Sequence, residues 1–362
     1  MHIPDGYLSP QTCAVGFVVT APAWIVAARR VRRTVKNRQV PTLAVLAAVC
    51  FLVMMFNIPI PDGTTAHAVG GVLVAVLLGP WAGVIAVSVA LAFQALLFGD
   101  GGVLAFGVNA LNMAVIGPFV GYGVYKLIAG RSELTSPRRA LAAAVGGYAG
   151  INASALATAI ELGIQPDLFH TAAGAPLYSP YHLAQTIPAM ALAHLTVAGL
   201  AEAILSGAVV AYLQRANLPL MKVNHPDVPL PGEGTAVRRR LPRPGLAAGI
   251  AVAVMALLTP LGLLAPGGAF GEDAPQDLDL HGLGLSSIPA GLNRYNGFWQ
   301  HTLFPDYGFT SGAHPTVAYV VSALVGIAVV GVVIFGVAAL ARAVFGRRGE
   351  RAENEEKAEA TS

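Results

Sequence analysis

The chain has 362 residues, of which 55% are hydrophobic and only 11% carry a charge. This composition excludes an ordinary soluble domain and predicts a membrane protein that crosses the bilayer several times. The formal net charge is only +3, and no basic soluble region suggests nucleic-acid binding. Cys13 and Cys50 both lie in apolar stretches, so we expect neither a disulfide nor a thiolate metal ligand.

Nine apolar segments follow one another along the chain and predict an all-α, polytopic fold. They cover about residues 11–28, 42–58, 67–79, 81–98, 103–128, 139–162, 183–213, 245–264 and 315–341. The third segment is shorter than the roughly 20 residues that a full crossing requires. We therefore expect it to be a half-helix or a helix tilted against its neighbours.

Lys and Arg are distributed very unevenly along the chain. The segments 29–41, 126–139, 214–243 and 342–362 together hold 21 of the 22 basic residues. By the positive-inside rule these segments face the cytoplasm, which places the N-terminus outside and the C-terminus inside. The opposite segments carry nine acidic residues and only Arg294. Such a face concentrates cations, although sorting of the basic residues alone would also leave the acids outside.

A Pro-rich linker over residues 216–243 divides the chain into two units of different design. Residues 1–215 form the larger unit. Residues 244–341 contain two apolar segments around an outer loop, 265–314, which is too long for a plain hairpin connection. The charged tail, 342–362, is expected to be disordered.

The beginning of the chain carries the strongest chemical signal. The first residues have neither the basic start nor the cleavage site of a signal peptide, so we expect Met1 to remain the N-terminus. Met1 and His2 then offer three nitrogens in a row: the α-amine, the His2 amide nitrogen once deprotonated, and the imidazole. These atoms close two fused chelate rings around one ion, and the imidazole of His67 would complete a planar set.

Four nitrogens in a plane suit Ni(II), Cu(II) or low-spin Co(II) and do not suit Zn(II), which prefers a tetrahedron. The tetrapeptide Ile-Pro-Asp-Gly, a turn signal, occurs at residues 3–6 and again at 60–63, just before His67. The alternative is that His2 is simply exposed and that His67 lies at the membrane interface without binding a metal.

Other polar residues lie within or beside the apolar segments. Asn109 and Asn112 are spaced i, i+3 on one predicted helix face, where they either support the metal site from outside or bond neighbouring helices. His194 and Glu202 are candidates because ionisable groups at depth are functional by default. We expect them to make a structural contact or a subunit interface rather than a second metal site.

The outer loop contains an acidic cluster with one histidine. Its members are Glu272, Asp273, Asp277, Asp279 and His281. Their oxygens would hold hard cations loosely, and a solvated loop surface is the alternative. The sequence lacks a Gly-x-x-x-x-Gly-Lys-Ser/Thr phosphate loop, so we do not expect the chain to hydrolyse ATP itself. It also lacks the His-Glu-x-x-His and Gly-x-Ser-x-Gly motifs, so we expect no enzyme activity.

Several motifs occur in the order typical of one family. They are Met1-His2-Ile3-Pro4-Asp5-Gly6, Asp62-Gly63 with His67 and Gly70-Gly71, Leu78-Gly79-Pro80-Trp81, the stretch 94–102, and Asn109 with Asn112-Met113. On these motifs residues 1–215 resemble the substrate-capture component of cobalt and nickel energy-coupling-factor (ECF) transporters, the CbiM/NikM family. Residues 244–341 resemble the small N component of such systems (CbiN/NikN-like), fused here to the same chain.

The resemblance implies a multi-pass protein of a prokaryotic plasma membrane, with seven helices in the capture unit. It implies a metal held by the Met1 amine, the His2 amide and imidazole, and His67, with no cofactor beyond the transported Ni(II) or Co(II). It also implies a transmembrane coupling subunit (T/Q-type) and cytoplasmic ATPase subunits (O-type) as partners. Nickel is favoured because fused M and N components are more familiar from nickel systems.

Two other functions remain open at this point. A self-sufficient secondary permease for divalent cations would need paired acids near the middle of the membrane, where the sequence predicts only Glu202. A metal sensor would need an output domain, and the short tail offers none.

Overall fold

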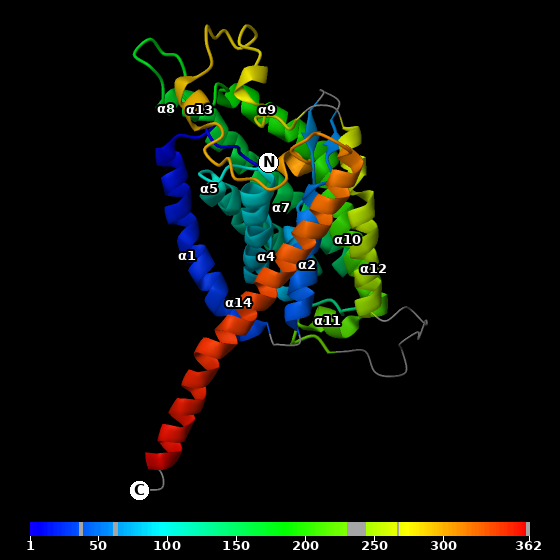
Figure 1. Ribbon diagram of the computed structural model, residues 1–362. Coiled ribbons are helices and arrows are strands. Elements are labelled where there is room, and N and C mark those ends of the chain that lie inside the picture. Colours follow the sequence, from blue (N-terminus) through cyan, green and yellow to red (C-terminus); the bar gives the residue numbers. More distant parts are fainter. Residues whose placement is uncertain (36–38, 61–63, 230–243, 266–267, 360–362) are drawn as a thin grey trace.

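The computed structural model describes residues 1–35, 39–60, 64–229, 244–265 and 268–359 (Figure 1). Its helices are α1 (Pro10–Thr34), α2 (Val40–Met54), α3 (Gly71–Leu78), α4 (Pro80–Phe93), α5 (Phe106–Ala110), α6 (Gly117–Ala129), α7 (Pro137–Gly163), α8 (Gln165–Leu168), α9 (Leu183–Ala193), α10 (Gly199–Ala216), α11 (Leu218–Lys222), α12 (Pro244–Leu258), α13 (Ala290–Tyr295) and α14 (Pro315–Glu359). The shorter pieces are the π-helical η2 (Gln94–Phe98), η3 (Leu111–Ile116) and η4 (His194–Ala198), and the 3₁₀ turns η5 (Thr259–Leu264), η6 (Pro275–Asp277) and η7 (Pro305–Tyr307). Two short strands, β1 (Ile58–Pro59) and β2 (Thr65–Ala66), pair antiparallel.

The all-α, polytopic prediction is confirmed. Seven helical stretches of the described residues are long and apolar enough to cross a membrane. They are Pro10–Thr34, Pro80–Phe98, Phe106–Ala129, Pro137–Leu168, Leu183–Ala216, Gly245–Leu264 and Pro315–Leu340. The second and third predicted segments correspond to shorter helices, the 15-residue α2 and the 8-residue α3.

Helix α3 is the half-helix of the bundle. All eight of its residues are buried, and it contacts α2, α4, α6, α7 and α10. It begins after Gly70 and ends at Gly79, both of which have left-handed φ values of 77° and 96° that glycine adopts without a steric penalty. Pro80 then starts α4, because proline is well accommodated in the first turn of a helix.

Helices α6 and α7 pack closely because glycines face one another. A Cβ on Gly121 would lie 2.6 Å from the carbonyl oxygen of Gly146 and 2.5 Å from the side chain of Val72. A Cβ on Gly117 would lie 2.7 Å from the Ser154 hydroxyl. The Gly117/Gly121 pair therefore packs helices of this chain against one another, as small residues four apart do in membranes.

The C-terminal unit lies against the larger one. Helix α14 runs diagonally across the bundle beside α2 and α12 and extends beyond the end opposite to the N-terminus (Figure 1). The segment between α12 and α14 folds over the end of the bundle that holds Met1. The two ends of the bundle thus differ, because one is covered by this segment and α14 extends beyond the other (Figure 1).

Two segments outside the predicted membrane spans contain helix. Helix α14 continues past residue 341 as far as Glu359, where Glu, Lys, Arg and Ala residues have high helix propensity. The linker 216–243 begins as ordered structure, since it forms α11 and its Asn224 amide donates to the Ala75 and Val76 carbonyls at the end of α3. Residues 230–243 of that linker lie outside the described residues.

We predict that Gly121→Ala destabilises the protein by about 1–3 kcal/mol, because the added methyl group overpacks the α6–α7 contact. Gly123→Ala is the matched control two residues further along α6, since a Cβ there would meet nothing within 4 Å. Thermal unfolding in detergent should show a lower midpoint for Gly121→Ala alone. Equal midpoints for the two variants would contradict this packing.

Candidate metal-binding site

The N-terminal segment before α1 is folded into the protein. The Met1, His2 and Ile3 side chains are at most 4% exposed. The Asn109 side chain holds this segment with two hydrogen bonds: its oxygen accepts from the Ile3 N–H at 2.9 Å, and its amide donates to the Ile3 carbonyl at 3.0 Å. Asn109 therefore fixes the main chain directly after the first two residues.

Asp5 ties the same segment to the glycine-rich stretch that precedes α5. Its carboxylate accepts hydrogen bonds from the N–H groups of Val103, Leu104 and Ala105 at 2.8–3.2 Å. Burial raises the pKa of Asp5, and these three bonds oppose that rise. Gly102 allows the close approach, because a Cβ there would lie 2.1 Å from an Asp5 carboxylate oxygen.

His2 and His67 lie face to face. Their ring centroids are 4.9 Å apart with an interplanar angle of 27°, and the two residues are 3% and 4% exposed. The β1–β2 hairpin, which pairs Ile58 with Ala66, presents His67 directly after β2. The structure thus brings together two imidazoles that are 65 positions apart in the sequence.

Each ring is held by one nitrogen and leaves the other unpartnered. Nδ1 of His67 lies 3.0 Å from the Ala68 carbonyl oxygen, and Nδ1 of His2 lies 3.1 Å from Oδ1 of Asp100. Nε2 of both rings is buried without a hydrogen-bond partner. A buried polar atom without a partner is costly, so a pair of them at one place indicates a ligand-binding site.

Burial makes both rings neutral near pH 7. Desolvation, with the positive charge of the Met1 amine as the next cause, lowers the pKa of His2 to about 4. The same two causes, in the same order, lower the pKa of His67 well below its usual 6.5. Neutral imidazoles have a nitrogen lone pair free to bind a metal ion.

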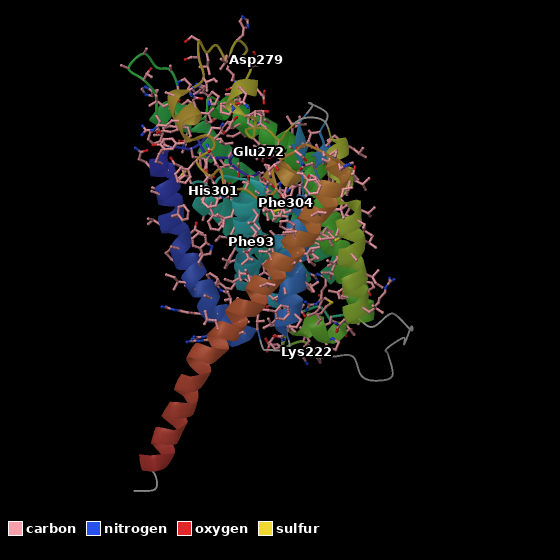
Figure 2. The ribbon with its side chains drawn as sticks, viewed as in Figure 1. Phe93, Lys222, Glu272, Asp279, His301 and Phe304 are labelled. Carbon is pink, nitrogen blue, oxygen red and sulfur yellow. The ribbon has the colours of Figure 1, made fainter. Side chains whose placement is uncertain are left out.

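The Met1 amine completes the cluster, and its partner comes from the C-terminal unit. The amine lies 2.9 Å from Oε1 of Glu272, a residue of the loop between α12 and α14. Figure 2 places Glu272 at the same end of the bundle as His301 and Phe304, and Lys222 at the opposite end. The sequence indicates Glu272 only as a member of an acidic cluster in the loop. Its contact with Met1 spans 271 positions, so no local sequence pattern indicates it.

A second residue of the loop reaches the site through Asp100. The Tyr307 hydroxyl donates to Oδ2 of Asp100 at 2.5 Å, and the Gln94 amide donates to the same hydroxyl at 2.9 Å. The Tyr307 ring stacks on Phe98 at 4.9 Å. Asp306 and Tyr307 both have positive φ values, 49° and 61°, a strained conformation for non-glycine residues that the surroundings must maintain.

Side chains alone do not supply a metal site here. Among the described residues, no group of three or more His, Cys, Asp or Glu side chains is arranged to hold a metal ion. The Met1 amine and the main-chain nitrogen of His2 could add nitrogen donors to the two imidazoles. A chelate formed by the Met1 amine, the His2 amide and the His2 ring would use Nδ1 of that ring. A metal ion bound in this way would replace the contact of Nδ1 with Asp100 and the contact of the Met1 amine with Glu272.

The other candidates have separate positions. Asn112 lies away from the N-terminus, where its amide donates to Thr158 and Glu161 on α7. His194 is buried in η4 with Nδ1 2.8 Å from the Met190 carbonyl oxygen. In the acidic cluster, Asp279 accepts from the N–H of Gly282 and does not join a metal-binding group.

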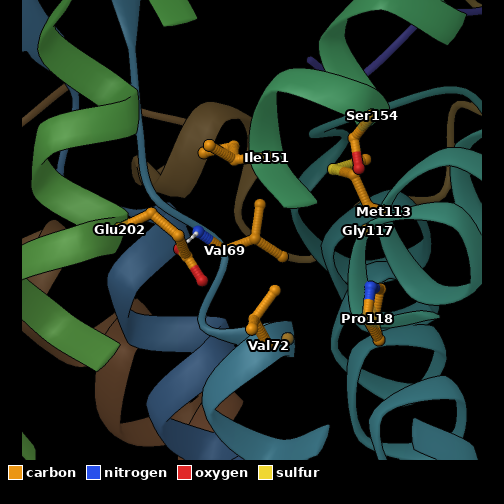
Figure 3. A pocket seen from close by; sticks show the side chains of 9 residues that line it. Val69, Val72, Met113, Gly117, Pro118, Ile151, Ser154 and Glu202 are labelled. Carbon is orange, nitrogen blue, oxygen red and sulfur yellow. Dashed lines mark hydrogen bonds between the residues drawn. The ribbon is translucent and has the colours of Figure 1, made fainter. Parts of the chain in front are cut away.

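Glu202 secures the chain that follows His67. Its Oε2 accepts from the Val69 N–H at 2.8 Å (Figure 3). The same oxygen accepts from the Gly70 N–H at 2.9 Å. The residue is 1% exposed and its Oε1 has no partner. Glu202 also lines a cavity of about 10 Å³ with Ser154, which is room for about one water molecule.

Comparison with known proteins agrees with this architecture. Residues 2–220 match the model of the CbiM family, described as the cobalt uptake substrate-specific transmembrane region. The fused nickel transport protein NikMN of Rhodobacter capsulatus is 47% identical over 339 residues, covering 90% of this chain and 94% of that protein. The probable fused nickel transport protein LarMN of Lactiplantibacillus plantarum is 47% identical over 333 residues, with the same two coverages.

Solved structures also match the larger unit. A crystal structure of a truncated transition metal transporter is 57% identical, with a TM-score of 0.56. The match covers 59% of this chain and 98% of that one. The chain is accordingly a multi-pass membrane protein with the fold of transition metal transporters.

We predict that Asn109→Ala frees the N-terminal segment, because the Ile3 N–H and carbonyl lose their partner. Leaving buried groups unsatisfied costs roughly 1–3 kcal/mol, so hydrogen exchange at the Ile3 amide should rise about 10- to 100-fold. Asn112→Ala is the matched control, since Asn112 bonds α7 instead. Unchanged exchange in Asn109→Ala would contradict the assigned role.

Proposed function

We propose that this chain, which belongs to the CbiM family of cobalt-uptake substrate-specific transmembrane regions, is the substrate-binding membrane subunit of an importer for Ni(II) or Co(II). The observation that carries the proposal is the pair of buried, stacked imidazoles of His2 and His67 beside the N-terminal amine, with Nε2 of His67 left without a partner. The names of the NikMN and LarMN relatives, which describe a fused and a probable fused nickel transport protein, support the same function.

The metal is bound by the Met1 amine, the amide nitrogen and imidazole of His2, and the imidazole of His67. A metal of the Ni, Cu or Co type is selected because it can ionise the amide and accept planar nitrogen donors. Asn109 supports the ligands by holding Ile3 in place. Asn112 supports the helix packing instead, as its contacts with α7 indicate.

Nickel is the favoured substrate. The NikMN and LarMN relatives, which each cover 90% of this chain, carry nickel in their names, and both are named as fused proteins. In this chain the corresponding unit supplies Glu272, which contacts the Met1 amine, and Tyr307, which contacts Asp100. The fused unit therefore contacts the Met1 amine directly, through Glu272, and His2 indirectly, through Tyr307 and Asp100. The incoming ion replaces the contacts that Glu272 and Asp100 make with these two ligands.

Energy comes from partner subunits of an energy-coupling-factor system. The chain has no phosphate loop, so a transmembrane coupling subunit and cytoplasmic ATPases drive release of the ion to the inside. The end of the bundle that carries α11, opposite to the metal site, is the face for these partners. Nickel uptake into liposomes by the purified chain alone would instead favour the self-sufficient permease.

The proposal predicts that one extra residue before Met1 abolishes tight nickel binding without unfolding the protein. The extension converts the Met1 amine into an amide, which is a poorer metal ligand. The added residue also has no space, because Met1 is buried with only 4% of its surface exposed. Metal analysis of the purified protein, with its thermal unfolding midpoint as the control for folding, tests this. Equal nickel content with and without the extension would refute the proposed ligand set.

His67→Ala is expected to weaken nickel binding by more than about 100-fold, because even groups that only support metal ligands cost 10- to 100-fold when lost. His182→Ala is the matched control, since that imidazole is 59% exposed and lies outside the site. Isothermal titration of both variants measures the effect. An unchanged dissociation constant in His67→Ala would remove His67 from the site.

A further inference from the structure

A second, larger cavity adjoins the candidate metal site. It has a volume of about 180 Å³ and lies between the N-terminal segment, the glycine-rich stretch 99–103 and the C-terminal loop. Residues that line it include Asp5, Gly99, Gly101, Gly102, Asn296 and Trp299. We call it the outer chamber.

The outer chamber has an exposed mouth and a buried floor. Gly99, Asn296 and Gly297 are solvent-exposed, whereas Ala95 and Gly102 are buried. The Trp299 indole fixes one wall by donating to the Leu96 carbonyl at 2.8 Å. The chamber therefore leads from the surface inward and is bordered by both units of the chain.

The inner end of the chamber lies against His2. A Cβ on Gly101 would be 3.4 Å from Cβ of His2 and 3.3 Å from the Asn109 amide nitrogen. Gly101 also has a φ of +84°, which other residues rarely adopt. Gly101 thus lines the chamber and also lies beside the proposed ligand His2.

The lining of the chamber suits a hydrated ion rather than a bare one. Four of its lining residues, Gly99, Gly101, Gly102 and Gly297, are glycines, whose main-chain groups can hydrogen-bond to water. The Asp5 carboxyl group lies in the wall of the chamber, where three N–H groups hold it in place and give that side of the chamber a polar character. A water molecule needs about 10–15 Å³ of such a cavity, so the chamber of about 180 Å³ can hold a cation with its first hydration shell.

We propose that the outer chamber is a binding vestibule for the hydrated divalent cation, from which the ion passes Gly101 and exchanges its water for the nitrogens of His2, Met1 and His67. This inference rests on the proposed function. The vestibule holds the ion through its water molecules, and the nitrogens remove that water in the next step. The mouth belongs partly to the C-terminal unit, so the fused unit controls how fast the ion arrives.

The test is the rate of nickel loading in Asn296→Trp, which fills the mouth and leaves the metal ligands unchanged. Purified full-length protein with a native N-terminus is mixed with Ni(II) in a non-coordinating buffer, and loading is stopped with chelator at set times. Loading and release should slow by the same factor, about tenfold or more, with an unchanged dissociation constant. Asn293→Trp is the matched control on α13, exposed but outside the lining, and should load like the unsubstituted chain.

A second variant separates blockage from altered folding. Asn296→Cys is purified, shown to load normally, and then modified with a bulky thiol reagent; the native Cys13 and Cys50 are buried and should not react. Slow loading only after modification supports the vestibule. Loading at the original rate after modification, or in Asn296→Trp, overturns it. If the unsubstituted chain binds no nickel at all, the proposed function fails instead.

Discussion

Burial of the N-terminal dipeptide is the constraint on which the rest of the structure depends. A charged amine and two imidazoles are withdrawn from water at one end of a helical bundle, and two of their nitrogens have no partner. Withdrawal of such groups is costly, so the scaffold must hold them with other contacts. Asn109 holds the main chain of Ile3, and Asp5 binds three N–H groups before α5. The first residues of the chain thereby have one defined position.

The C-terminal unit is part of this arrangement rather than an attachment to it. Glu272 contacts the amine, and Tyr307 orients the carboxylate that contacts His2. Since both groups belong to the same chain as the ligands, their effective concentration at the site is high without a separate binding step.

Sequence reasoning predicted the transmembrane segments well because hydrophobicity and segment length are local properties. It also predicted the short third segment, whose flanking Gly70, Gly79 and Pro80 mark its ends. Asn109 and Asn112 were assigned to one face from their i, i+3 spacing. The structure separates them because the π-helical η3 begins at Leu111, and the wider turn rotates Asn112 toward α7.

Contacts made at long range could not be predicted in the same way. The bond between Met1 and Glu272 and the bond between Asp100 and Tyr307 each span more than 200 positions. Glu202 was recognised as a buried acid, but its role in holding Val69 and Gly70 depends on where α10 packs. Local sequence patterns predict helices and the side of a helix on which a residue lies. Which residues bond to each other across the bundle depends on how the helices pack.

The central claim is that nitrogen donors from a buried N-terminus hold the ion in a plane. X-ray absorption at the nickel edge of the loaded, full-length protein tests it most directly. The account predicts a planar, four-coordinate nickel with nitrogen donors and the multiple-scattering signature of imidazole. A six-coordinate, oxygen-rich nickel in protein with an intact N-terminus would contradict it.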